Sequence, residues 1–256
     1  MMKLNLLKIG GKVWSSEKEK KELLQQFAKL EGPKILVHGG GKKASELCQQ
    51  LDIPVKMLNG RRITDGQTLE VATMVYGGLI NKQLVANLQA LGIQALGMSG
   101  ADLNLIRAQK RLKGAVDYGY VGDITAINLK ALKVLLEQGF TPVICALSHD
   151  GKGQLLNTNA DTIASTLAKA LSDEYEVQLH LCLELSGVLM NIKKPESLIA
   201  TMDVKTFKQQ CRKGLITEGM IPKLKNGFEA LESGVQSVQI CGPGNWYQQK
   251  GTQLCI

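Results

Sequence analysis

A lysine lies near the end of the first apolar segment of the chain, directly ahead of two glycines. The stretch reads NLLKIGGKV, residues 5–13, and Lys8 precedes Gly10 and Gly11. An ammonium group in a buried strand is costly unless an anion meets it there. Backbone N–H groups in a glycine turn also favour an anion. We therefore expect Lys8 and this turn to meet an anionic ligand.

A second glycine turn follows the next apolar segment. ILVHGGGKKASELCQQL, residues 35–51, is typical of a strand, a turn and a helix, an arrangement that offers N–H groups and the positive end of a helix dipole to an anion. In a parallel sheet both turns lie at the carboxyl edge, where α/β proteins bind ligands. A tight turn without a ligand is the alternative for either turn alone.

Two phosphate-binding patterns give different results. No window fits the Walker A pattern, whereas Gly39-x-Gly41-x-x-Ala44 fits the dinucleotide pattern. The acidic residue that an NAD enzyme places about twenty residues further on is replaced by MLNGRR. Arg61 or Arg62 would suit a 2′-phosphate, so an NADP-dependent oxidoreductase stays open as an alternative.

Two later segments add polar groups. In LLNTNADTIASTLAKAL, residues 155–171, Asn157, Asn159 and Asp161 alternate up to a predicted helix start. Asp161 would suit a helix cap, but the run has more hydrogen-bonding capacity than one cap requires. Lys223 falls in the first turn of an amphipathic helix, where an ordinary surface lysine is the alternative.

The elements that position these residues alternate along the chain. Apolar runs of strand type fall between segments of helical period, which are residues 17–30, 41–51, 66–91, 128–138, 160–171 and 223–233. This predicts an α/β fold around a mainly parallel sheet, with a smaller second lobe from about residue 176. Hairpins are expected at 58–66 and 147–157, where Asp150-Gly151 is a turn signal.

Composition excludes several classes of protein. Of 256 residues 44% are hydrophobic, and the formal charge is +8. Aromatic residues make up only 4%, so stacking platforms for nucleic acid are not expected. The six cysteines lack metal-ligand spacing and predict reduced thiols in a cytoplasmic protein. We expect no signal peptide and no membrane span.

These segments together resemble the amino acid kinase family. The resemblance is carried by motifs in order along the chain: KIGG at 8–11, VHGGGK at 37–42, NGRRIT at 59–64, INKQLV at 80–85, GMSGADLNLI at 97–106, DYGYVGDI at 117–124, NTNAD at 157–161, GMIPK at 219–223 and GT at 251–252. It implies a three-layer αβα sandwich. Residues 1–175 would bind an N-acylglutamate and dimerise, and residues 176–256 would bind ATP.

The chemistry that the resemblance implies is transfer of the γ-phosphoryl group of ATP to the side-chain carboxylate of an N-acylated glutamate, in arginine biosynthesis. The protein mainly positions the reactants and neutralises charge in such a reaction. A carboxylate is already ionised at neutral pH, so no general base is needed.

The resemblance also implies roles for single residues. Lys8 would bind the transferring phosphoryl oxygens, Lys223 the phosphates of ATP, and Asp161 would hold both ammonium groups. Arg62 would grip the substrate α-carboxylate and Asn157 would help to orient it. Phosphoryl oxygens and the amino acid would be cradled by the backbone of Gly10, Gly11, Gly40 and Gly41. Mg²⁺ would be bound through ATP phosphates, with no protein metal site.

Two departures affect the expected contacts. The nucleotide contacts would come from Glu184, Ser186, Gly187, Leu189 and Thr217, but Glu184 replaces an aspartate that is common in relatives. Ala101 stands where many relatives have lysine, so an acyl group larger than acetyl, such as succinyl, is open.

Assembly and rival functions complete the expectations. Only seven residues precede Lys8, which leaves no room for the extra helix of arginine-inhibited relatives. We therefore expect a homodimer that is insensitive to arginine, paired through the apolar face of 68–91, for which core packing is the alternative. Other members of the family, acting on carbamate, aspartate or a nucleotide, and a non-catalytic sensor stay open. NGRRIT argues against carbamate, which has no α-carboxylate.

Overall fold

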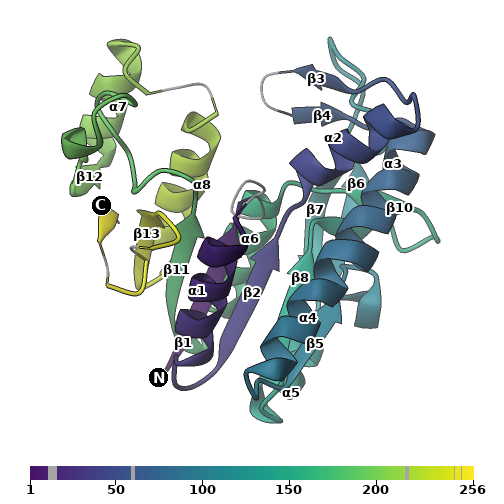
Figure 1. Cartoon of the computed structure of the whole chain (residues 1–256), viewed down its shortest axis with the longest axis horizontal. Helices are drawn as coiled ribbons and strands as arrows, with labels where there is room; N and C mark the ends of the chain where they lie inside the picture. The colour runs from purple at the N-terminus through teal and green to yellow at the C-terminus, as the bar shows by residue number, and fades with distance from the viewer. Residues whose placement is uncertain (11–15, 59–60, 217–218, 245, 249) are drawn as a thin grey trace. The chain divides into compact units, whose positions relative to one another are not determined.

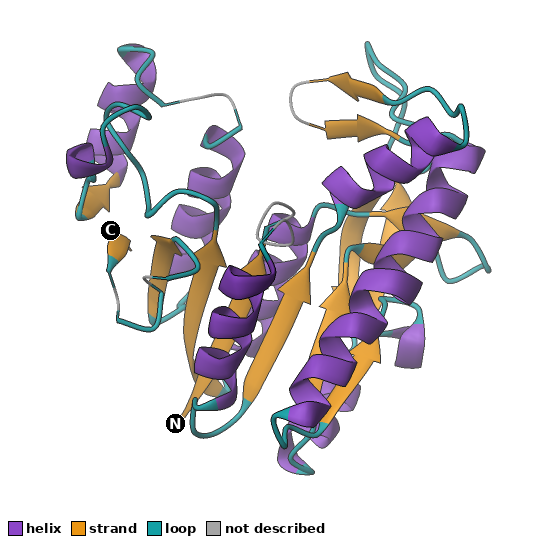
Figure 2. Cartoon of the chain, viewed as in Figure 1, coloured by secondary structure: helices purple, strands orange, loops and turns teal. Residues whose placement is uncertain are grey.

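The computed structural model describes all residues except 11–15, 59–60, 217–218, 245 and 249 (Figure 1). Helices alternate with strands along the chain (Figure 2). The helices are α1 Glu17–Ala28, α2 Gly41–Gln50, α3 Gly66–Thr73, the π-helix η2 Met74–Ile80, α4 Asn81–Ala90, the 3₁₀ turn η3 Asp102–Asn104, α5 Leu129–Glu137, α6 Ala160–Leu171, the 3₁₀ turn η4 Pro195–Ser197, α7 Val204–Arg212 and α8 Ile221–Glu232. The strands are β1 Met2–Ile9, β2 Lys34–His38, β3 Lys56–Leu58, β4 Arg61–Ile63, β5 Ala95–Met98, β6 Ile106–Lys110, β7 Gly122–Ile127, β8 Thr141–Cys145, β9 Leu147–His149, β10 Leu155–Asn157, β11 Tyr175–Cys182, β12 Thr201–Asp203, β13 Ser237–Cys241 and β14 Gly251–Cys255.

The chain forms two compact units, each described separately below. Unit 1 comprises residues 1–34 and 164–256, and unit 2 comprises residues 35–163. The sequence predicts a different division, by ligand, into residues 1–175 for the N-acylglutamate and residues 176–256 for ATP. This assignment of ligands to lobes stays a prediction.

The sheet of unit 1 has the strand order β12-β14-β13-β11-β1. β11 pairs in parallel with both β1 and β13, while β13 and β14 are antiparallel. The six residues of β1 from Leu4 onward are buried, which explains its continuous apolar run. Lys8 lies within this buried run, in register with Leu181 of β11.

Unit 2 contains parallel strands in the order β2-β8-β5 and a second sheet in the order β10-β9-β6-β7. β9 and β10 form the antiparallel hairpin predicted over 147–157, with Leu155 opposite His149. β3 and β4 form the hairpin predicted over 58–66. The α/β class and the mainly parallel sheet are confirmed.

The predicted helix over 66–91 is interrupted. Asp65 caps its start by accepting a hydrogen bond from the Thr68 amide at 2.9 Å, and the helix then widens into η2 before α4 begins. In contrast, the N-cap residue of α2 is Gly40, and no side chain caps the helix from that position. The first turn of α2 thus begins at a glycine turn, where backbone N–H groups point out of the helix.

Candidate active site

The first glycine turn follows β1. Lys8 is 5% exposed, and a Cβ placed on Gly10 would lie 3.8 Å from its ammonium nitrogen, so that nitrogen lies close to the turn. The Gly10 amide donates to the carbonyl oxygen of Cys182 at 3.1 Å, which ties the start of the turn to β11. The structure thus brings Lys8 and Gly10 together, while Gly11 lies outside the described residues.

The second glycine turn follows β2 and requires glycine for steric reasons. A Cβ on Gly40 would lie 2.6 Å from Tyr76 Cδ1 and 2.7 Å from Ile80 Cδ1. Both distances are far below van der Waals contact, so Tyr76 and Ile80 pack directly on the backbone of the turn. Gly41, at the start of α2, lies near two polar groups. A Cβ placed on Gly41 would lie 3.8 Å from Arg62 Nη2 and 3.9 Å from the Tyr76 hydroxyl oxygen.

Arg62 joins the β3–β4 hairpin to this turn, and the hairpin lies beside α2 in Figure 1. Its side chain is buried, with Nη2 donating to the Gly41 carbonyl oxygen at 2.8 Å and to Ser45 Oγ at 2.7 Å. Nη1 is also buried and has no hydrogen-bond partner among the described residues. A buried guanidinium nitrogen without an acceptor is costly, and an anionic ligand at the turn would supply one.

Tyr76 is a site residue that the sequence did not single out. Burial raises the pKa of its hydroxyl, and the nearby Arg62 guanidinium opposes that shift by charge and by hydrogen bonding. The tyrosine lies in η2, and π-helical turns occur frequently at functional sites. Its place in an apolar helical pattern is typical of core packing, so the sequence carried no signal for this role.

His38 fixes the start of the second turn. Its Nδ1 lies 2.8 Å from the Gly39 carbonyl oxygen, which can only accept, so Nδ1 carries the proton. Its Nε2 then accepts from Asn81 Nδ2 at 3.1 Å, and Asn81 Nδ2 also donates to the Val143 carbonyl oxygen at 2.8 Å. Burial lowers the pKa of His38 to about 4, the Gly39 hydrogen bond acting against it, so the ring is neutral at neutral pH.

Asn157 is linked to the strand of Arg62. Its Nδ2 donates to Thr64 Oγ1 at 3.0 Å, and Thr64 lies two residues after Arg62. Thr64 Oγ1 donates in turn to the Arg62 carbonyl oxygen at 3.3 Å. The structure therefore connects the two residues that the sequence assigned to the amino acid substrate.

The start of α6 is capped by Asn159. Its Oδ1 accepts from the amides of Asp161 at 2.8 Å and Thr162 at 3.1 Å. Asp161 is the second residue of α6 and is only 4% exposed. The capping role considered for Asp161 thus belongs to Asn159, and Asp161 has another reason to be buried.

The predicted nucleotide residues lie in unit 1. Lys223 is half-buried in the first turn of α8, Glu184 is exposed, Ser186 is half-buried, and the Leu189 side chain is buried. A Cβ on Gly187 would lie 2.8 Å from Thr252 Oγ1. Thr217 lies outside the described residues.

Thr252, in the closing GT motif, organises this segment. Its Oγ1 accepts from the Val188 amide at 2.8 Å and donates to the Ile199 carbonyl oxygen at 2.6 Å. A Cβ on Gly251 would lie 2.4 Å from the Ile240 carbonyl oxygen, which accounts for the glycine. The sequence had identified GT only as a motif, because these partners are distant along the chain.

Within the part of the chain that the structure describes, no three His, Cys, Asp or Glu side chains are placed to hold a metal ion. No helix in the described ranges has the length and apolar character needed to cross a membrane.

Comparison with known proteins identifies relatives and the fold of this chain. An acetylglutamate kinase from Parabacteroides distasonis is 51% identical over 254 residues, covering 99% of this chain and 100% of the relative. Two solved structures share the fold: N-acetylglutamate synthase from Neisseria gonorrhoeae complexed with coenzyme A and N-acetyl-glutamate, and carbamate kinase from Giardia lamblia bound to AMP-PNP. The synthase is 20% identical with a TM-score of 0.84, covering 100% of this chain and 59% of that one. The carbamate kinase is 14% identical with a TM-score of 0.69, covering 99% and 98%. A family model described as the amino acid kinase family matches residues 3–242. The chain belongs to the amino acid kinase family.

Proposed function

We propose that this chain is an acetylglutamate kinase, which transfers the γ-phosphoryl group of ATP to the side-chain carboxylate of N-acetyl-L-glutamate in arginine biosynthesis. The relative from Parabacteroides distasonis, which carries this name, matches over its whole length. The nicotinamide alternative rested on one glycine pattern, and the family assignment replaces it.

The geometry of Arg62 carries the choice of substrate. Nη2 is fully engaged by Gly41 and Ser45, so the guanidinium is held rigidly while Nη1 lacks an acceptor among the described residues. A rigid, buried guanidinium suits a carboxylate better than a neutral group. The α-carboxylate of an N-acylglutamate supplies such an acceptor, with Asn157 orienting the same molecule through its link to Thr64.

The remaining roles follow from charge. Lys8, buried beside the Gly10 turn, would neutralise the transferring phosphoryl oxygens. Lys223 at the start of α8 would bind phosphates on the ATP side, and the buried Asp161 carboxylate would orient the two ammonium groups. The nucleotide would contact the backbone of Gly10 and the segment from Glu184 to Leu189.

Mg²⁺ would accompany ATP. The ion would be held by phosphate oxygens and water rather than by carboxylates of the protein. Bound in that way it neutralises phosphate charge, and the protein's own contribution stays with its lysines and backbone amides.

The cellular setting and assembly are part of the proposal. All six cysteines are free thiols, which suits the reducing cytoplasm. Met74 and Leu79 of η2 are 53% and 43% exposed, whereas Val75 and Ile80 on the same helix are buried in the core. A homodimer that covers Met74 and Leu79 would remove this apolar surface from water. Leu79→Lys should then shift the mass measured by light scattering from dimer to monomer.

ADP release measured with a panel of acceptors tests the proposed substrate. N-acetyl-L-glutamate should give saturable turnover, and N-acetyl-L-aspartate, one methylene shorter, should give little. N-succinyl-L-glutamate belongs in the panel because Ala101, which replaces a lysine of many relatives, is exposed. Turnover with carbamate or aspartate but not with any N-acylglutamate would overturn the proposal.

A further inference from the structure

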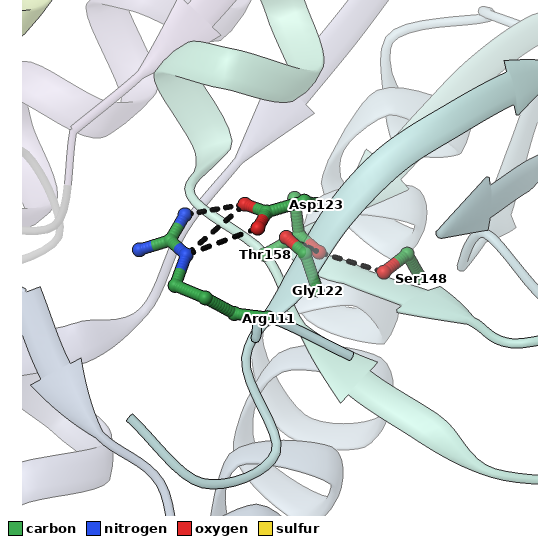
Figure 3. Close-up of polar contacts among 5 residues, drawn as sticks. All are labelled: Arg111, Gly122, Asp123, Ser148 and Thr158. Atoms are coloured by element: carbon green, nitrogen blue, oxygen red, sulfur yellow. Dashed lines mark hydrogen bonds and ion pairs between the residues drawn. The ribbon is translucent and has the colours of Figure 1, made fainter. Parts of the chain in front are cut away.

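The hairpin loop between β6 and β7 is closed by an ion pair. Lys110 at the end of β6 lies opposite Gly122 at the start of β7. Arg111 Nε lies 3.1 and 3.2 Å from the two carboxylate oxygens of Asp123, and Nη2 lies 2.5 Å from Oδ1 (Figure 3). The Arg111 amide also donates to the Val121 carbonyl oxygen at 2.8 Å. The guanidinium thus binds the carboxylate through two nitrogens at the base of the loop.

Two cations also lie over tyrosines of the same loop. The Arg111 guanidinium carbon is 5.4 Å from the centre of the Tyr118 ring, and Lys110 Nζ is 4.4 Å from the centre of the Tyr120 ring. These distances are typical of cation–π contacts. Both tyrosines are therefore held at their rings as well as through the backbone.

The end of the loop, just before β7, binds the backbone of Thr64. The Thr64 amide donates to the Tyr118 carbonyl oxygen at 3.0 Å, and the Tyr120 amide donates to the Thr64 carbonyl oxygen at 2.7 Å. Gly119, between the tyrosines, has a φ of 70°, and a Cβ there would lie 2.2 Å from the Thr64 carbonyl oxygen. Only glycine permits both this φ and this approach.

The same loop also binds Asn157. The Asn157 amide donates to the Tyr120 carbonyl oxygen at 2.9 Å, while its side chain donates to Thr64 Oγ1. The loop backbone thus contacts Asn157 directly, and reaches Arg62 through Thr64, whose hydroxyl donates to the Arg62 carbonyl oxygen.

The other side of β7 is anchored in the core next to Asn157. Thr158 Oγ1 donates to the Gly122 carbonyl oxygen at 3.3 Å and lies 2.6 Å from Ser148 Oγ (Figure 3). A Cβ on Gly122 would lie 2.7 Å from Ser148 Oγ and 2.9 Å from Thr158 Oγ1. Gly122 and Asp123 are adjacent, so the contacts that hold Gly122 also hold Asp123. The ion pair therefore attaches Arg111, at the start of the loop, to a well-packed part of β7.

From these contacts we infer that Arg111 and Asp123 are positioning residues for the amino acid substrate. This inference rests on the proposed function. Their ion pair holds the loop 112–121 in place. The loop binds Asn157 directly and binds Thr64, which contacts Arg62, so it sets the positions of both proposed substrate-binding side chains. A partly exposed ion pair such as this one ordinarily contributes little to the free energy of unfolding. We therefore assign its bidentate geometry to the placement of the loop.

The test measures KM for each substrate separately. Arg111→Ala should raise KM for N-acetylglutamate about tenfold or more, the effect of losing a charge-assisted pair, and leave KM for ATP within about twofold. Arg111→Lys keeps the charge without the fork and should restore part of the loss. Lys113→Ala is the matched control, because Lys113 lies in the same loop, is 76% exposed and approaches Asp117 only to 3.9 Å. It should leave both constants unchanged.

A double variant separates a pair from two independent residues. Asp123→Asn should reproduce the effect of Arg111→Ala, and the combined variant should be no worse than either single one. Additive effects, an equal rise in KM for both substrates, or wild-type KM for N-acetylglutamate in a folded Arg111→Ala protein would overturn the inference.

A measurement without substrate separates failure of this inference from failure of the proposed function. Amide hydrogen exchange should speed up at Thr64 and Tyr120 in Arg111→Ala and stay as in the wild type in Lys113→Ala. Unchanged exchange would show that the Arg111–Asp123 ion pair does not hold the loop, even if the enzyme phosphorylates N-acetylglutamate. A wild-type protein that phosphorylates no N-acylglutamate would overturn the proposed function instead.

Discussion

The Arg62 guanidinium donates to the carbonyl oxygen of Gly41 at 2.8 Å and to Ser45 Oγ at 2.7 Å, so two hydrogen bonds join the hairpin strand β4 to the first part of α2. The contact places a fixed cation at the start of α2, whose N-cap residue is Gly40. A positive charge beside a helix N-terminus favours binding of a carboxylate.

Replacing Arg62 should chiefly weaken binding of the amino acid. Arg62→Ala should raise KM for N-acetylglutamate about 10- to 100-fold with a smaller change in kcat, because the contact is made in the ground state and in the transition state alike. The neighbouring Arg61 is exposed, so Arg61→Ala is the control and should behave as the wild type. A rise confined to KM for ATP would contradict the assignment.

Replacing Lys8 should lower the rate of the chemical step. Lys8→Met removes the charge but keeps much of the volume, and kcat should fall by on the order of 10²-fold or more, as for loss of a preorganised transition-state contact. Lys3→Met, on the exposed start of β1, is the control. A Lys8→Met enzyme with normal turnover would show that Lys8 has no part in catalysis.

Variants of Asp161 and Asn159 should have different effects, one on catalysis and the other on the stability of helix α6. Asp161→Asn should lower kcat without loss of stability, whereas Asn159→Ala should cost about 1 kcal/mol of unfolding free energy, since it removes the acceptor for two amides of α6. Urea unfolding and initial rates measured on both variants give the comparison. If Asp161→Asn were the less stable protein with normal kcat, the two roles would be reversed.

Acid should destabilise the fold through His38. The pKa of this residue is about 4 in the folded protein, against an ordinary value of 6.5 for an exposed histidine, so between these values the unfolded chain binds more protons. Stability therefore falls as the pH falls from 6.5 to 4, by about 3 kcal/mol for this residue at full titration. His180, whose pKa burial also lowers, acts in the same direction.

Urea unfolding at several pH values measures this effect. The loss of stability between pH 7 and pH 4 should be clearly smaller in His38→Gln than in the wild type, whatever the stability of the variant at pH 7. Equal slopes in the two proteins would exclude His38 as the titrating group.

Much of the fold was predictable because its signals are local. The helix over 160–171 agrees with α6 residue for residue, and the Asp150-Gly151 turn marked the β9–β10 hairpin. α7 was not predicted, because its sequence VKTFKQQCR is mostly polar and buries only Phe207. The break of the 66–91 segment at η2 leaves no mark on an apolar pattern that continues through it.

The site was predictable to the extent that its chemistry is unusual in sequence. A lysine in a buried strand and repeated glycines stand out, and Lys8 and the turn of Gly40 were identified in that way, whereas the role of Arg62 came from the family resemblance of NGRRIT. Tyr76 was missed because an aromatic residue in a helix ordinarily packs in the core. The hydrogen bonds between Thr64 and the loop of Tyr118 were missed because they join distant segments.

Trapping of the acyl phosphate would detect phosphoryl transfer to the side-chain carboxylate itself. The protein would be incubated with ATP, Mg²⁺ and hydroxylamine, and N-acetyl-L-glutamate would be compared with its N-succinyl analogue and with free L-glutamate. An acetylglutamate kinase should give a hydroxamate from an N-acylglutamate, dependent on ATP and strongly reduced in Lys8→Met, and little from free glutamate. Robust hydroxamate from free glutamate alone, or none from any N-acylglutamate, would contradict the proposed function.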